Sequence, residues 1–118
     1  MANDLTAFRE TRQRMNERIL SSGNLGIKRF FALDSAAYRD GALPAQTKEL
    51  LGLASSMVLR RNDCIDYHLG QTVEAGCSDE EIIETMQIAL VVGGSIVIPH
   101  LRHAFETLDN LRAGGSGE

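Results

Sequence analysis

The stretch from Lys48 to His68 places the strongest constraint on what this chain can fold into. Its apolar residues recur at three- and four-residue steps as far as Val58, which is the period of a helix with one buried face. A polar break at residues 60–63 follows, in which Asn62 or Asp63 is a suitable N-cap for another helix. The stretch therefore predicts two consecutive helices joined by a short turn.

The remaining sequence is also helical in pattern. Apolar residues give a first helix from Asp4 to Leu20 and a second to about Tyr38, and Ser78 with Glu81 is the signature of a capping box. Pro44 and Pro99 suit the first turns of two further helices. The run at residues 95–99 is too short to build a sheet. We expect one all-α domain over residues 1–118, with about six helices and a flexible tail at 113–118.

A candidate catalytic set lies on the two helices around the polar break. Cys64 falls in the first turn of the second helix, where unpaired N–H groups and the positive end of the helix dipole favour the nucleophilic thiolate. His68 is one turn further on the same face and can approach the sulfur. Glu49, on the preceding helix, adds a carboxylate that is useful only if it is buried towards His68. We predict Cys64, His68 and Glu49 as catalytic residues.

These residues resemble a known family. Glu49, Cys64 and His68 fit the pattern E-x11-C-x-x-C-x-x-x-H, except that Arg61 stands at the first cysteine. With the segments CIDYH and EAGCSDEEI and a later Gly-Gly pair, residues 25–110 resemble the carboxymuconolactone decarboxylase superfamily, in its alkylhydroperoxidase D-like branch. The resemblance implies the helical fold of this family and assembly into trimers or hexamers. It also implies that the histidine and the glutamate relay protons. It also implies that the second cysteine attacks peroxide and the first resolves it as a disulfide.

Because Arg61 replaces the first cysteine, we expect one-cysteine chemistry of the peroxiredoxin type. Cys64 would reduce a hydroperoxide and form a sulfenic acid, which an external thiol would then reduce. Cys77 cannot form a disulfide with Cys64 within one chain, since it lies at the far end of the same predicted helix, roughly 20 Å from Cys64. Tyr67, Arg61 and His103 are candidates for binding the substrate.

Two alternatives remain open at this stage. The resemblance also covers decarboxylases, whose substrate is a small organic acid, an anionic lactone. These enzymes act through histidines at the positions of His68 and His103. The chain could instead be a non-catalytic oligomeric member of the family.

Composition and charge limit the kinds of partner that this chain can bind. A net charge of −4 and the lack of a basic cluster beyond Arg60-Arg61 argue against nucleic acid. No long apolar run or signal peptide is present, so we expect no membrane and a cytoplasmic location. We expect no cofactor and no metal. The segment Ile82 to Val92 is apolar on nearly every side, which predicts a homo-oligomer, a trimer or hexamer.

Overall fold

The predicted all-α fold is confirmed by a computed structural model that describes residues 5–114. Within that range the chain forms six α-helices and one 3-10 helix, and no strand. The elements are α1 (Leu5–Leu20), α2 (Leu25–Ala37), α3 (Ala45–Val58), α4 (Asn62–Glu74), α5 (Asp79–Gly93), η1 (Ser95–Val97) and α6 (Ile98–Ala113). The short apolar run at residues 95–99 thus forms η1 and the start of α6.

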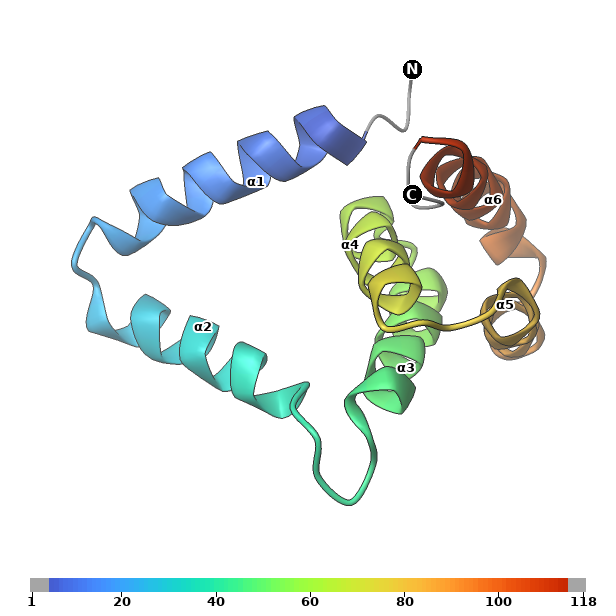
Figure 1. Ribbon diagram of the computed structural model, residues 1–118, viewed down its shortest axis with the longest axis horizontal. Coiled ribbons are helices and arrows are strands. Elements are labelled where there is room, and N and C mark those ends of the chain that lie inside the picture. Colours follow the sequence, from blue (N-terminus) through green and yellow to red (C-terminus); the bar gives the residue numbers. More distant parts are fainter. Residues whose placement is uncertain (1–4, 115–118) are drawn as a thin grey trace.

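The core lies among the last four helices. Helix α3 packs against α4 and α5, and α4 packs against α6 (Figure 1). Each of these helices contributes the apolar residues of one face, as the three- and four-residue spacing requires. The fully buried side chains of this core include Leu53, Met57, Ile65, Leu69, Ile82, Met86 and Val97. The core thereby fixes α3 and α4, the two helices that carry the candidate site.

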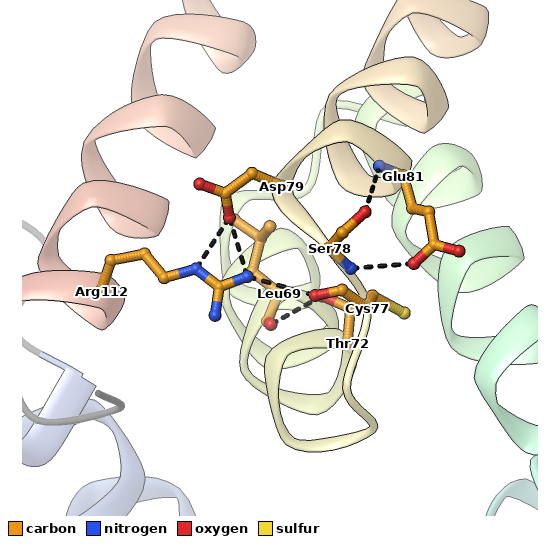
Figure 2. Close-up of polar contacts among 7 residues, drawn as sticks. All are labelled: Leu69, Thr72, Cys77, Ser78, Asp79, Glu81 and Arg112. Carbon is orange, nitrogen blue, oxygen red and sulfur yellow. Dashed lines mark hydrogen bonds and ion pairs between the residues drawn. The ribbon is translucent and has the colours of Figure 1, made fainter. Parts of the chain in front are cut away.

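A polar network fixes the start of α5 (Figure 2). The Ser78 hydroxyl accepts from the Glu81 N–H at 3.1 Å, and the Glu81 carboxylate accepts from the Ser78 N–H at 2.8 Å, which confirms the capping box. From α6, Arg112 Nε donates to Asp79 at 2.8 Å, and its Nη2 donates to the Cys77 carbonyl at 3.2 Å. These bonds satisfy backbone groups at the start of α5 and join it to the end of α6.

Several helix ends differ from the expectation. Pro44 is the N-cap of α3 rather than a first-turn residue, and the Asp40 carboxylate accepts from the Ala45 N–H at 2.6 Å. The final helix continues through Ala113, so this residue is helical rather than part of a tail. The rest of the expected tail beyond residue 114, and Asp4 at the other end, lie outside the described residues.

Helices α1 and α2 extend away from this core (Figure 1). Leu5 is the only buried residue among those described in α1, and none of the α2 residues is buried. Phe30 and Leu33 on α2 are each 66% exposed. Large apolar side chains of the first two helices are therefore left uncovered in a single chain. Among the described residues, none of the helices is long and apolar enough to cross a membrane.

Candidate active site

Cys64 is positioned by an abrupt turn between α3 and α4. The Arg61 N–H bonds to the Ser56 carbonyl and the Arg60 N–H to the Met57 carbonyl, both at 3.0 Å, which closes α3 in a Schellman motif. Glycine usually occupies the left-handed position of this motif, but here it is Arg60, with φ +60°. Within residues 5–114 no other non-glycine residue has a positive φ. The chain can therefore enter α4 with almost no linker.

The first turn of α4 differs from the sequence-based prediction. Arg61 is the N-cap, without a side-chain capping bond, and the helix begins at Asn62. Neither predicted cap residue caps the helix, since both lie inside it. The Asn62 side-chain oxygen instead accepts from His100 Nδ1 on α6 at 2.8 Å. Cys64 is still in the first turn, as the third residue of α4, and its side chain is partly exposed.

The His68 ring is buried and held on one side by Glu49. Both residues are 7% exposed, and His68 Nδ1 lies 2.8 Å from Glu49 Oε1. A carboxylate only accepts hydrogen bonds, so Nδ1 carries the proton and donates it. In the neutral ring, Nε2 then keeps its lone pair and can accept a proton. Glu49 thus meets the condition of being buried towards His68.

Space for this ring depends on Gly52. A Cβ at residue 52 would lie 2.6 Å from His68 Cε1 and 2.8 Å from each ring nitrogen. These distances are far below ordinary contact, so the ring can pack directly on α3 only because residue 52 has no side chain. Three residues apart on α3, Glu49 and Gly52 together fix where the imidazole lies.

Two tyrosines complete the surroundings of the imidazole. The Tyr38 hydroxyl lies 3.4 Å from His68 Nε2, and the centroids of the two rings are 5.2 Å apart. Tyr67 packs edge-on at 5.1 Å between centroids, and the Arg12 guanidinium of α1 lies 4.0 Å from the Tyr67 centroid. Burial raises the pKa of both tyrosines, which keeps the phenols protonated at neutral pH.

Cys64 lines cavities on the α1 and α2 side of α4. A cavity of about 1060 Å³ is lined by Cys64, Tyr38, Glu49 and Arg61, together with residues of α1 and α2. A second cavity of about 370 Å³ lies between Cys64, His68 and α1. The thiol, the imidazole and both tyrosines therefore line space that a small molecule could enter.

The comparison with known families agrees with this arrangement. A model of the carboxymuconolactone decarboxylase family matches residues 27–107. The chain belongs to the carboxymuconolactone decarboxylase family. The matched segment contains Tyr38, Glu49, Cys64 and His68, whereas helix α1 with Arg12 lies before it.

Solved structures of similar proteins share the whole fold. One from Thermotoga maritima is 57% identical with a TM-score of 0.91, over 95% of this chain and 98% of that one. A second Thermotoga maritima structure is 59% identical with a TM-score of 0.87, over 91% of each chain. It is a member of the carboxymuconolactone decarboxylase family for which an involvement in antioxidative response has been suggested. An uncharacterised protein of Cupriavidus necator is 30% identical over 84 residues, which cover 71% of this chain and 74% of that protein.

His103, one of the predicted substrate-binding residues, lies elsewhere. Its Nε2 is 2.9 Å from the Asp66 carboxylate, which also accepts from the Thr107 hydroxyl at 2.8 Å. Burial raises the pKa of Asp66. This cluster joins α4 to α6 and does not line the cavities onto which Cys64 opens. Within residues 5–114 no cluster of three or more His, Cys, Asp or Glu side chains is placed to hold a metal ion.

The other predicted residues are distributed as follows. Arg61 lines two of the cavities that Cys64 lines, including one of about 540 Å³. Cys77 does not lie on the Cys64 helix, because α4 ends at Glu74 and the chain turns at Gly76, with φ +87°. Cys77 is 3% exposed beside the start of α5, and burial raises the pKa of its thiol. Both cysteines are free thiols.

Tyr38 is the site residue that the sequence did not reveal. It is the C-cap of α2 and lies in no motif, thirty positions before the histidine that it contacts. The only sequence signal available is that the chain has two tyrosines and no tryptophan. Both tyrosines are against His68.

Proposed function

We propose that this protein reduces hydroperoxides through Cys64, with an external thiol as the reductant. The observation that carries the proposal is the buried 2.8 Å bond between Glu49 and His68, beside a cavity that also contains a free thiol at a helix start. A hydrogen bond from Nδ1 to a carboxylate fixes the tautomer and the orientation of the ring, which leaves the Nε2 lone pair available to accept a proton. The site thus combines a nucleophile, a base and a group that orients the base.

The reaction follows from these groups. His68 Nε2 accepts the Cys64 thiol proton, and the thiolate attacks the distal oxygen of a hydroperoxide, ROOH. An S–O bond forms as the O–O bond breaks, leaving Cys64 as a sulfenic acid and RO⁻, which takes up a proton to become an alcohol. A thiol then displaces water from the sulfenic acid to form a mixed disulfide, and a second thiol releases Cys64. The two thiols leave as a disulfide, so electrons balance.

One similar protein supports an antioxidative role. One Thermotoga maritima relative, 59% identical, has a suggested part in antioxidative response. The lactone-acting alternative would use His68 with His103, but His103 lies against Asp66, outside the Cys64 cavities. Thiol chemistry at Cys64 is therefore better supported. Because the cycle needs a supply of reduced thiols, we also propose a cytoplasmic location.

We further propose a homo-oligomer, a trimer or hexamer. On α5, Ile88, Val91 and Val92 are 59%, 74% and 69% exposed in a single chain. Several large apolar side chains exposed together on one helix are typical of a subunit interface. The uncovered face of α2, which borders the cavity of about 1060 Å³, adds to this exposed apolar surface. A neighbouring subunit would then lie close to the site.

Consumption of cumene hydroperoxide with and without dithiothreitol tests the peroxidase proposal. We expect turnover that depends on the dithiol, loss of turnover in Cys64→Ser, and near-normal turnover in the matched variant Cys77→Ala. Alanine suits this control because buried Cys77 packs as a small apolar side chain. Turnover that survives in Cys64→Ser would exclude thiol chemistry at this residue. A wild-type protein without turnover would favour the non-catalytic alternative.

A further inference from the structure

The proposed reaction needs a second proton transfer besides the deprotonation of Cys64. The alkoxide that leaves a hydroperoxide is a strong base, so the O–O bond breaks readily only if a proton is supplied to it. In the first step His68 takes the thiol proton on Nε2. The Glu49 carboxylate accepts from the other ring nitrogen, Nδ1, and faces away from Nε2. A group that lies next to Nε2 and lines the same cavity as Cys64 can pass a proton to the leaving oxygen while Nε2 replaces it.

Tyr38 meets both requirements. Its hydroxyl is the group next to Nε2, at 3.4 Å, and its side chain lines the two cavities of about 1060 and 540 Å³ that Cys64 and Arg61 also line. Burial, followed by the charges of Asp34 and Glu49, raises the pKa of Tyr38. The phenol is therefore a protonated donor at neutral pH. An alkoxide is much more basic than a phenolate, so the transfer still runs downhill.

The direction of the contact reverses during the reaction. While Nε2 has its lone pair, the Tyr38 hydroxyl donates to it. Once Nε2 has taken the thiol proton, the nitrogen becomes a donor and the Tyr38 oxygen the acceptor. The phenol proton is then released from His68 and can point into the cavity. Deprotonating the thiol thus prepares the donor for the leaving group.

We propose that Tyr38 is the proton donor to the alkoxide that leaves when Cys64 opens a hydroperoxide. The proposal rests on the peroxidase function proposed above. As the O–O bond breaks, the Tyr38 proton passes to RO⁻ to give ROH, and the His68 Nε2 proton passes to the Tyr38 oxygen. Tyr38 and His68 end in their starting states. The net change is one thiol and one hydroperoxide converted to one sulfenic acid and one alcohol.

Tyr67 provides a comparison on the same imidazole. Its ring packs on His68 at nearly the same centroid distance as that of Tyr38, 5.1 against 5.2 Å. The Arg12 guanidinium stacks on the Tyr67 ring, and burial also raises the pKa of the Tyr67 phenol. Of the two, only the Tyr38 hydroxyl is within hydrogen-bond distance of Nε2. Replacing each tyrosine by phenylalanine keeps the ring and removes only the hydroxyl.

Two reagents separate proton donation from a structural role. Cumene hydroperoxide releases an alkoxide, which needs a proton, whereas iodoacetamide releases iodide, which needs none. Rates with Cys64 would be measured by stopped flow for the hydroperoxide and by mass spectrometry for alkylation. We expect Tyr38→Phe to slow the hydroperoxide reaction by about 10- to 100-fold. Its alkylation rate should change by less than about threefold. Tyr67→Phe should not separate the two reactions, so that any change in its hydroperoxide rate is matched by its alkylation rate.

Each other outcome contradicts the proposal. Equal slowing of both reactions in Tyr38→Phe would assign Tyr38 a structural role, and unchanged rates would remove it from the reaction. If wild-type Cys64 is alkylated but does not react with hydroperoxide, the proposed function fails, and this inference with it. The wild-type protein alone gives a further check. Across hydroperoxides whose product alcohols differ in acidity, the rate should vary only weakly, and a steep dependence would show that no donor acts.

Discussion

Substitution of Gly52 offers a direct way to displace the His68 ring from α3. In Gly52→Ala the new Cβ would lie 2.6 Å from His68 Cε1, so the ring must move by about 1 Å to reach ordinary contact. That movement lengthens the 2.8 Å bond to buried Glu49 beyond hydrogen-bonding range. Overpacking costs about 1–3 kcal/mol and loss of a hydrogen bond to a charged group about 1.5–3 kcal/mol. Alanine regains up to about 1 kcal/mol in helix propensity.

We therefore expect Gly52→Ala to lower the free energy of unfolding by about 1.5–5 kcal/mol, a large part of the roughly 5–15 kcal/mol of a typical domain. Urea denaturation measures it. Gly70→Ala on α4 is the matched control, because its Cβ meets the flexible end of Arg9, with Nη2 at 2.7 Å. That variant should stay within about 1 kcal/mol of wild type. Equal stability of Gly52→Ala and wild type, with unchanged Cys64 reactivity, would refute the described packing of His68.

Three further predictions concern other parts of the molecule. Arg61→Cys should form a disulfide with Cys64 on oxidation, since Cα atoms three residues apart on a helix are about 5–6 Å from each other; mass spectrometry without reductant detects it, and its absence would contradict the assumed register. Val91, which is 74% exposed in one chain, should lie in a subunit interface, so Val91→Glu should reduce the sedimentation coefficient of an oligomeric wild type; a wild-type monomer, or unchanged assembly, would show otherwise. Burial raises the pKa of Asp66 above its ordinary value of 3.8, so its contribution to stability is present below that pH and is lost as pH rises through the folded-state value. The stability of wild type relative to Asp66→Asn, from urea titrations at several pH values, should therefore fall as pH rises from below 3.8, and a rise would contradict the buried position.

The sequence predicted the parts of the structure that depend on local patterns. Helix spacing and the Ser78–Glu81 capping box are local signals, and both are confirmed. The placement of Cys64 in a first turn needed only the polar break before it. The N-cap prediction was wrong, since α4 begins at Asn62 with Arg61 as its cap, and the Asn62 side chain bonds instead to His100, thirty-eight residues later. A contact at that sequence separation leaves no trace in the pattern around Asn62.

The same limit applies to the surroundings of the imidazole. The spacing of Glu49 and His68 indicated that they could meet, but nothing local indicated that Tyr38 would lie against Nε2. Its place depends on how α2 returns to α3. The need for a glycine at residue 52 is likewise visible only once the ring and α3 are in contact. Tertiary packing, rather than any motif, decided these two residues.

Trapping the oxidised sulfur tests the central claim most directly. The wild-type protein would be treated with stoichiometric cumene hydroperoxide in the presence of dimedone, which reacts with sulfenic acids, and then analysed by peptide mapping. We predict a dimedone adduct on the peptide that contains Cys64, little on that of buried Cys77, and an equivalent amount of the product alcohol. An adduct confined to Cys77, or no adduct with the hydroperoxide unconsumed, would contradict the proposal that Cys64 is the reactive thiol.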